Sequence, residues 1–279
     1  MPWIPRGLRD GIVTTRYPRR PDDYGPGFRG AITVEEGRHA DPEPGALEAI
    51  CPTGAISVSE GGPRLDRGRC ILCGRCSQLH PDLFRSDAGL EHSALERGHL
   101  IVPTLDEDTA ELQAMRRQLA ERTRALRRSI HIRHVDAGSD GTEEWEIAAL
   151  TNPIYDVQRL GIFFTASPRH ADVLLVTGVG SAGMLGPLRQ TFEAMPDPKV
   201  VIAVGTDAVS GGLLSESDMT TGGIAATVPV DIWLAGSPPS PFGIINALLV
   251  AVGKLDPTPA RPAAPSTSTT GSRGGRRSR

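Results

Sequence analysis

The sequence is 279 residues long, which predicts two modest domains rather than one small module. Hydrophobic residues make up 39% of the chain and charged residues 23%, a composition typical of globular proteins. Because 30 basic residues stand against 33 acidic ones, the formal net charge is −3, which excludes the basic surface of a bulk nucleic-acid-binding protein. The best apolar run, Ile244–Val252, is far shorter than the about 20 residues that a membrane span needs. The N-terminus lacks the apolar core of a secretory signal, so we expect a cytoplasmic protein without a membrane span of its own.

The first predicted domain spans residues 1–103. It is rich in proline and glycine, contains all four cysteines, and has only short apolar runs, such as Ala31–Val34 and Ala55–Val58. Runs of this length predict short strands. They leave little material for a hydrophobic core, so we expect a small domain that something other than apolar burial stabilises.

A connecting helix is predicted for residues 104–130. Thr104–Glu107 forms a capping box, a side-chain pattern that commonly starts a helix. Apolar residues then recur at heptad-like spacing and form one stripe, which consists of Leu105, Leu112, Met115, Leu119 and Leu126. We expect this stripe to pack either on its own protein or on a partner subunit.

Residues 131–256 are predicted to form a second domain in which strands and helices alternate. The expected strands are Ser129–Val135, Val173–Val176 and Val200–Val204, and the expected helices are Met184–Met195 and Pro241–Leu255. Two of these strands are continuous apolar runs, as in strands that are covered on both faces of a parallel sheet. The alternation predicts a doubly wound α/β domain.

Residues 257–279 are predicted to be a disordered basic tail. They contain five arginines and no acidic residue, and most of the others are Pro, Ser, Thr and Gly. Such a segment has too few apolar side chains to form a core.

The spacing of the four cysteines is the strongest signal in the sequence. Cys70, Cys73 and Cys76 are three residues apart, and Cys51 lies upstream and is followed by Pro52. Thiols at this spacing on a short looped segment can converge on one cubane cluster, and in two-cluster bacterial ferredoxins the fourth ligand is a Cys-Pro from the other run. The four cysteines therefore form a complete ligand set for one 4Fe-4S cluster.

The ligands of a second ferredoxin cluster are missing together. By the same spacing rule, the run that ends at Cys51 should contain three further cysteines, and those positions hold Asp41, Pro44 and Leu47. The fourth position, after the second run, holds His80. We therefore expect a single cluster in this domain and a second site that is vacant.

Other roles for these residues remain as alternatives. Four cysteines can bind a structural zinc ion, but three of them within seven residues fit the usual paired arrangement poorly. Disulfides are disfavoured in a cytoplasmic chain. An imidazole can bind iron, but His80 lacks suitable co-ligands at the neighbouring positions, so we expect a surface or capping role for it.

Three motifs of the first domain, Gly11–Pro18, Phe28–Gly30 and Cys51–Ile56, carry a family resemblance. They resemble the two-cluster ferredoxin-type subunit of formate hydrogenlyase, membrane-bound nickel-iron hydrogenases and respiratory complex I. The resemblance implies an α+β ferredoxin-like fold for residues 1–103.

The second half contains further motifs, which are His134–Ser139, Tyr155–Gly161, Ser167–Gly178, Pro196–Lys199 and Pro229–Asp231. They resemble the neighbouring subunit of the same complexes, the 20 kDa-type or hydrogenase small subunit, which implies a flavodoxin-like parallel-sheet domain. The whole chain thus resembles a fusion of two adjacent subunits.

The small-subunit family ordinarily binds a proximal 4Fe-4S cluster through cysteines, and here the resemblance places Asp140, Glu143, Asp207 and Ser237 at those positions. Carboxylates and hydroxyls are hard ligands that are unsuited to a sulfide-bridged cluster. We therefore expect no cluster in the second domain. Oxygen ligands can hold a divalent metal ion, but we favour a solvated or salt-bridged site without one.

A glycine pattern in the second domain offers a competing interpretation. Gly178, Gly180 and Gly183 have the spacing of the dinucleotide-binding fingerprint, and Asp207 ends the next expected strand. The family resemblance instead assigns this loop to a flavodoxin-like turn without a nucleotide. We therefore treat dinucleotide binding as the weaker alternative.

The sequence contains no acid–base pair or nucleophilic triad that indicates catalysis by the chain itself. The resemblance implies an electron-transfer subunit of an oxidoreductase complex, with a large subunit and membrane subunits as partners and a peripheral position on the cytoplasmic face of the plasma membrane. Because only one cluster is expected, a structural assembly subunit without through electron transfer is the alternative.

Overall fold

A computed structural model describes residues 3–20, 28, 30–35, 43–89, 92–103, 109–127, 129–214 and 217–255. The predicted capping box and the predicted basic tail lie outside these described residues.

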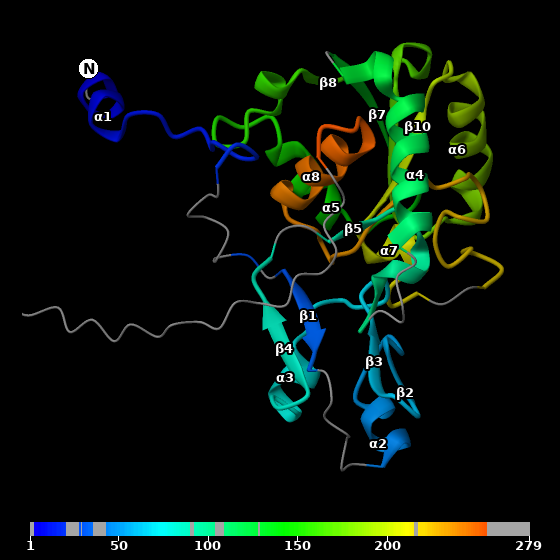
Figure 1. Ribbon diagram of the computed structural model, residues 1–279. Helices are drawn as coiled ribbons and strands as arrows, with labels where there is room; N and C mark the ends of the chain where they lie inside the picture. Colours follow the sequence, from blue (N-terminus) through cyan, green and yellow to red (C-terminus); the bar gives the residue numbers. More distant parts are fainter. Residues whose placement is uncertain are drawn as a thin grey trace, which may run out of the picture.

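Two small antiparallel sheets form the cysteine-bearing part of the chain, in the lower half of Figure 1. The first sheet pairs β1 (Ala31–Val34) with β4 (Phe84–Asp87), and the second has the order β2-β3-β6. The bounds of the remaining elements are β2 (Ile56–Ser59), β3 (Gly62–Asp66), β6 (Ile101–Val102), α2 (Pro44–Ala49) and α3 (Arg75–Leu79). The core between them is small and includes Cys70 and Cys76 themselves. The ferredoxin-like assignment of this half stays a prediction.

A six-stranded sheet forms the centre of the second half. Its order is β8-β7-β9-β10-β11-β5, and all pairs are parallel except the last. The strands are β7 (Ile130–Asp136), β8 (Ile162–Phe164), β9 (Val173–Thr177), β10 (Val200–Val204), β11 (Ile232–Leu234) and β5 (Ser93–Ala94). Counted from β7, the five parallel strands have the order 2-1-3-4-5 of flavodoxin-like folds. The predicted doubly wound parallel sheet is thus confirmed.

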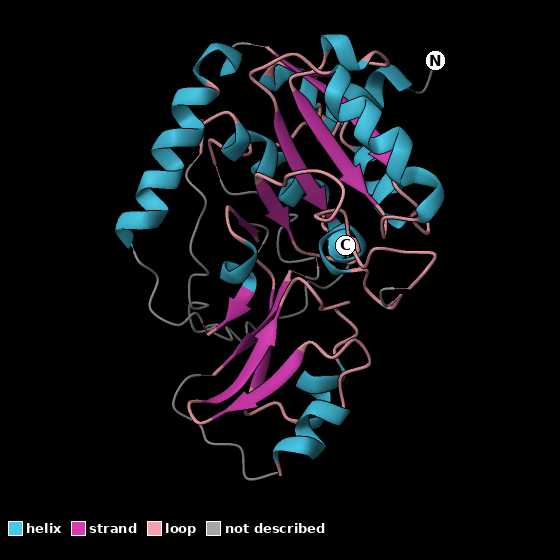
Figure 2. Ribbon diagram, turned by 90° about the vertical axis from the view of Figure 1, so that its right-hand side faces the viewer, coloured by secondary structure: helices cyan, strands magenta, loops and turns pink. Residues whose placement is uncertain are grey.

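Helices cover both faces of this sheet (Figure 2). The bounds are α4 (Thr109–Arg122), α5 (Thr142–Ala149), α6 (Ala182–Ala194), α7 (Gly205–Ser210) and α8 (Pro241–Ala251). Core residues of α4, α5 and α8 pack on one face, and those of α6 and α7 pack on the other. Every residue of β9 and β10 is buried, which explains why these strands are apolar without alternation.

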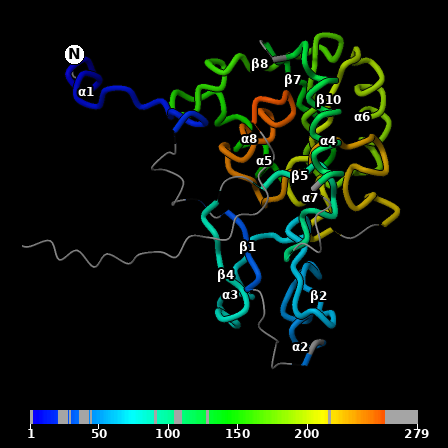
Figure 3. The backbone as a smooth tube through the Cα atoms, in the orientation of Figure 1, coloured from blue at the N-terminus to red at the C-terminus, as the bar shows by residue number. Residues whose placement is uncertain are grey.

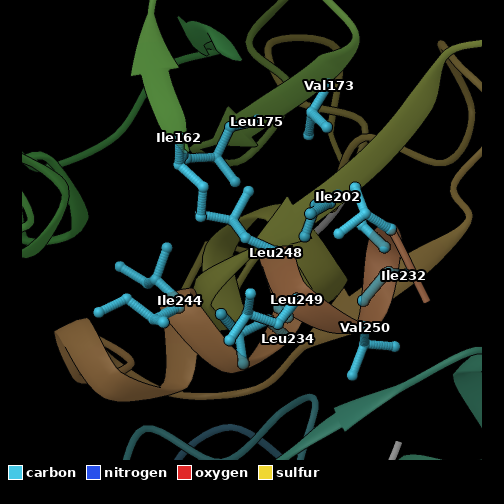
Figure 4. Close-up of a cluster of buried hydrophobic side chains, with 14 of the residues drawn as sticks. Ile162, Val173, Leu175, Ile202, Ile232, Leu234, Ile244, Leu248, Leu249 and Val250 are labelled. Carbon is cyan, nitrogen blue, oxygen red and sulfur yellow. The ribbon is translucent and has the colours of Figure 1, made fainter. Parts of the chain in front are cut away.

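The apolar run Ile244–Val252 forms most of α8, whose residues are all buried. Ile244, Leu248 and Leu249 lie against side chains of the sheet (Figure 4). The run is therefore a core helix, and no helix within the described ranges is long and apolar enough to cross a membrane.

The apolar stripe of the connecting segment packs on its own protein. Leu112 and Leu119 of α4 are buried in the same core as the sheet, and Leu126 joins them from a 3₁₀ turn, Arg124–Arg127. The sequence predicted that the stripe packs either on its own protein or on a partner subunit. These leucines pack on their own protein. Leu105 lies outside the described residues.

Residues 1–103 and the second half of the chain are joined by a common sheet and by buried hydrogen bonds. β5 belongs to residues 1–103 but pairs antiparallel with β11 of the large sheet, and it lies beside α8 (Figure 3). The buried amide of Asn246 in α8 accepts a hydrogen bond from Ser93 Oγ at 3.1 Å and donates one to the Tyr17 hydroxyl at 3.1 Å. A buried polar side chain needs such partners, so Asn246 ties two segments of the first 103 residues to the core of the second half.

Replacing Leu119 with alanine should lower the free energy of unfolding by about 2–5 kcal/mol, because it leaves a cavity under α4. Chemical denaturation of the two proteins measures this difference. Leu213→Ala is the matched control, since Leu213 is 66% exposed, and its effect should stay within about 0.5 kcal/mol. Equal losses in both variants would contradict the packing of α4.

Candidate functional site

The four cysteines line one small cavity. Cys51 follows α2, Cys70 and Cys73 lie in the loop between β3 and α3, and Cys76 lies in α3. The rest of the lining is mainly apolar and includes Ile32, Ile56, Leu65 and Ile71. All four thiols are free of disulfides. The structure thus brings together every cysteine that the sequence proposed as a ligand.

The backbone of the cysteine loop makes this convergence possible. Leu72 and Gly74 both adopt left-handed conformations, with φ of 53° and 74°. A positive φ is uncommon for leucine, and neither conformation fits a strand or a helix. The segment before α3 is therefore a loop, and its cysteines line the same cavity as Cys51 and Cys76.

The surroundings of the sulfur atoms make free thiolates unfavourable. Burial, more than any other factor, raises the pKa of Cys70 to about 12; the neighbouring cysteines contribute to this shift, and the backbone N–H of Leu72 opposes it. Burial also raises the pKa of Cys76. Four thiolates cannot share an apolar cavity unless positive charge compensates them. The iron of a 4Fe-4S cluster supplies such charge, and four sulfur donors are the ligand set of that cluster.

Hydrogen bonds from the backbone also reach this cavity. The N–H of Ala55 donates to Cys51 Sγ at 3.2 Å. Such donors stabilise negative charge on a ligand sulfur. Cys73 is exposed while Cys70 and Cys76 are each 8% exposed, so one edge of the site faces solvent.

The residues that stand where a second ferredoxin cluster would have its cysteines have other roles. His80 follows α3, and its backbone N–H donates to the carbonyl of Cys76 at 2.8 Å. Its side chain does not belong to the lining of the cysteine cavity. Leu47 is fully buried in the small core, and Asp41 lies outside the described residues.

A second group of side chains lies at the carboxyl end of the parallel sheet. One carboxylate oxygen each from Asp140, Glu143 and Asp207 lies within 4.8 Å of the other two. Asp140 and Glu143 come from the segment after β7, and Asp207 comes from α7 directly after β10. The carboxyl ends of parallel strands meet at one edge, which is why residues about sixty positions apart converge. We call these three residues the acidic group.

Ser237, the fourth position that the family resemblance proposed, lines another cavity. Its neighbours there include Ile71 and Leu72 of the cysteine loop and Glu146 of α5. The structure therefore places Ser237 in a cavity that the cysteine loop and α5 also line.

Burial sets the charge of the acidic group. Burial raises the pKa of Glu143 to about 7, and the carboxylates of Asp207 and Asp140 add to this shift. Burial also raises the pKa of Asp207 to about 6. Hydrogen bonds from the hydroxyl and N–H of Thr142 lower the pKa of Asp140. The group therefore holds protons at pH values where isolated carboxyls have lost them.

Gly205 provides the space for the buried carboxylate. A Cβ on this residue would lie 2.4 Å from Glu143 Oε1, and its φ is 87°. Only glycine fits both the backbone conformation and the close approach. The start of α7 is therefore shaped around Glu143.

The same short helix contacts the cysteine loop. Thr206 Oγ1 is 3.0 Å from the carbonyl oxygen of Cys70, and Ser210 Oγ donates to the carbonyl of Gly68 at 2.7 Å. Thr206 directly precedes Asp207 of the acidic group, so α7 contributes to one candidate site and contacts the loop of the other. The sequence did not single out Thr206 or Ser210, because nothing in their spacing distinguishes them from other helical hydroxyls.

The glycine pattern of the dinucleotide fingerprint has a packing role here. A Cβ on Gly178 would lie 2.6 Å from the backbone of Gly138, so this glycine lets the loops after β9 and β7 meet. Gly183 has open space around its Cα and does not mediate the close helix–strand contact of the fingerprint. The expected ribose-binding acid, Asp207, belongs to the acidic group.

Comparison with known proteins places the second half in a family. The family model for the NADH ubiquinone oxidoreductase 20 Kd subunit matches residues 141–251. The probable membrane-bound hydrogenase subunit mbhJ of Pyrococcus furiosus is 35% identical over 148 residues, which are 53% of this chain and 89% of that protein. The chain belongs to the 20 Kd subunit family. The matched range contains Glu143 and Asp207 but none of the four cysteines.

Other similar proteins match over a smaller share of their own length. Formate hydrogenlyase subunit 7 of Escherichia coli is 35% identical over 55% of this chain and 58% of that protein. NAD(P)H-quinone oxidoreductase subunit K of a Picosynechococcus strain is 42% identical over 37% of this chain and 43% of that protein. A chain of the archaeal membrane-bound sulfane sulfur reductase shares 29% identity, with a TM-score of 0.42, over 47% of this chain and 74% of that chain.

Replacing Glu143 with glutamine should stabilise the protein at high pH. Because the pKa is raised from 4.5 to about 7, the folded state binds a proton between these values that the unfolded state has released. The free energy of unfolding of the natural protein therefore falls as the pH rises through this window. At about pH 8 the variant should gain about 2 kcal/mol, and at about pH 4 the two proteins should be equal.

Urea denaturation in the presence of a chelator, at both pH values, measures this difference. Glu193→Gln on the exposed surface of α6 is the control and should show no pH-dependent gain. A gain from Glu143→Gln that is the same at both pH values would contradict the raised pKa.

Proposed function

We propose that the chain is an iron-sulfur electron-transfer subunit of a membrane-associated oxidoreductase complex of the hydrogenase, formate hydrogenlyase or NADH-quinone oxidoreductase kind. Membership of the 20 Kd subunit family supports the kind of complex, since the relatives named above are subunits of such enzymes. The observation that carries the proposal is the convergence of all four cysteines on one mainly apolar cavity.

In this proposal Cys51, Cys70, Cys73 and Cys76 hold one 4Fe-4S cluster. A bound cluster supplies reversible one-electron transfer. The two buried cysteines and the apolar lining keep water away from it, and the N–H of Ala55 stabilises the negative sulfur of Cys51. The exposed side at Cys73 is the edge where an electron donor or acceptor approaches most closely.

The second domain holds no cluster in this proposal. The positions that the family resemblance assigned to its cysteine ligands are occupied by carboxylates and a serine, and these hard ligands disfavour a sulfide-bridged cluster. The surface near this end of the sheet nevertheless carries exposed apolar side chains, which are Trp145 of α5 and Leu213, Leu214 and Met219 of the segment after α7. Large apolar side chains left exposed are typical of protein interfaces, and a large subunit is the proposed partner.

The carboxylates of the acidic group are unsuited to a cluster, and this favours a second candidate function. If electrons do not pass the second domain, the chain serves as an assembly subunit, in which the cluster stabilises the first half and the parallel-sheet domain docks the large subunit. The two candidate functions differ in whether electrons pass from the cysteine site into the second domain. A large-subunit partner that has lost its own nickel-iron ligands would support the assembly role.

The first experiment is anaerobic purification with iron and sulfide analysis and EPR of the dithionite-reduced protein. We expect about four irons per chain and one reducible signal. Cys73→Ser should abolish both, because Cys73 is exposed and its replacement removes a ligand without disturbing the core. Zinc, or no metal, in the natural protein would contradict the electron-transfer role.

Asp207→Asn is the matched control for the second domain. It should leave the iron content and the EPR signal unchanged, since Asp207 holds no iron in this proposal. About eight irons per chain, with half lost in Asp207→Asn, would show that the acidic group does ligate a cluster.

A further inference from the structure

The helix α1 (Trp3–Asp10) stands away from the other described elements (Figure 1), but its attachment is well defined. The Oγ1 of Thr14 and the N–H of Thr15 donate to the carbonyls of residues 153 and 154, each at 2.8 Å. Tyr17 is buried, and its ring packs edge-on against the core of the second half. This anchor fixes the point at which α1 leaves the body of the protein.

One side of α1 is apolar and fully accessible. Trp3 is 68% exposed, Ile4 45% and Leu8 82%. Ile4 and Leu8 are one helical turn apart and Trp3 is adjacent, so the three side chains share a face, while Arg6 and Arg9 lie on the opposite side. Large apolar side chains that remain exposed on one helix face indicate a binding surface.

The apolar face continues past the end of the helix. Ile12 is 87% exposed and Val13 46%. All residues from 3 to 13 are exposed, so the described part of the chain covers none of this surface.

The charge of this segment opposes that of the chain as a whole. Residues 3–20 contain five arginines and one aspartate, a net charge of +4, whereas the complete chain has a net charge of −3. A short helix with a tryptophan and leucine on one face and arginines on the other matches the layers of a bilayer surface that contains anionic lipid. The arginine stems reach up to the phosphates while the apolar face enters the acyl boundary.

We propose that α1 lies in the headgroup layer of a membrane with anionic lipids, with Trp3, Ile4 and Leu8 toward the acyl chains and Arg6 and Arg9 at the phosphates. The inference rests on the proposed function for the presence of a membrane complex, and it adds the surface that meets the bilayer. One helix of eight residues buries little area, so the attachment is reversible and assists binding to membrane subunits.

Vesicle co-sedimentation of the full-length, anaerobically purified protein tests this proposal. Binding is expected to vesicles of equimolar phosphatidylglycerol and phosphatidylcholine and should be much weaker to phosphatidylcholine alone. Leu8→Glu should reduce the partition coefficient about tenfold or more, and Arg9→Gln about fivefold. High salt should reduce the binding of the natural protein toward that of Arg9→Gln.

Matched controls separate α1 from other surfaces. Arg169→Gln introduces the same change of charge at an exposed position of the second half and should bind vesicles like the natural protein, as should a chain that lacks residues 257–279. Binding that survives Leu8→Glu, or that is lost with the tail, would overturn the proposal. Loss of co-purifying subunits in Leu8→Glu without loss of vesicle binding would assign α1 to a protein partner and would also overturn it.

Iron content distinguishes failure of this proposal from failure of the proposed function. Leu8→Glu should keep the full iron content, because α1 contributes nothing to the cysteine cavity. A protein without iron that still binds vesicles through α1 would contradict the electron-transfer role alone.

Discussion

The contact between α7 and the cysteine loop is the constraint on which the arrangement of both sites depends. Thr206 is fully buried, and its hydroxyl lies within hydrogen-bonding distance of the carbonyls of Cys70 and Gly236. A buried hydroxyl without such partners would be costly, so the contact specifies how the cysteine loop sits on the end of the large sheet. Because α7 directly follows β10, the position of a sheet strand determines the position of the cysteine site.

This arrangement places two chemically different sites on the two sides of one short helix. On one side, sulfur ligands line an apolar cavity that suits a soft, redox-active cluster. On the other side, the acidic group offers hard oxygen atoms whose charge is reduced by burial. The hydrogen bonds of α7 join the cysteine loop to the second half, while the carboxylates of the acidic group are hard ligands that disfavour a sulfide-bridged cluster. Both the electron-transfer role and the assembly role depend on these contacts. The two roles differ only in whether electrons pass into the second domain.

The attachment of the first residues to the second half has a similar physical basis. Asn246 interrupts the apolar run of α8, and its amide binds Tyr17 and Ser93, which lie far apart in the sequence. Asn246 therefore organises the N-terminal segment on the core of the second half. From that anchor, α1 projects with its apolar face uncovered by the described chain.

The sequence by itself determined the features that depend on local pattern. Continuous apolar runs predicted β9 and β10, alternation of strands and helices predicted the doubly wound sheet, and the spacing of Cys70, Cys73 and Cys76 identified a shared site, because periodicity and spacing are local properties. The tertiary structure alone decided the rest: that Leu119 faces its own core, that β5 joins the large sheet, and that Thr206 connects the two halves. Those outcomes depend on strand order and on close packing between segments distant in the chain, which no local pattern encodes.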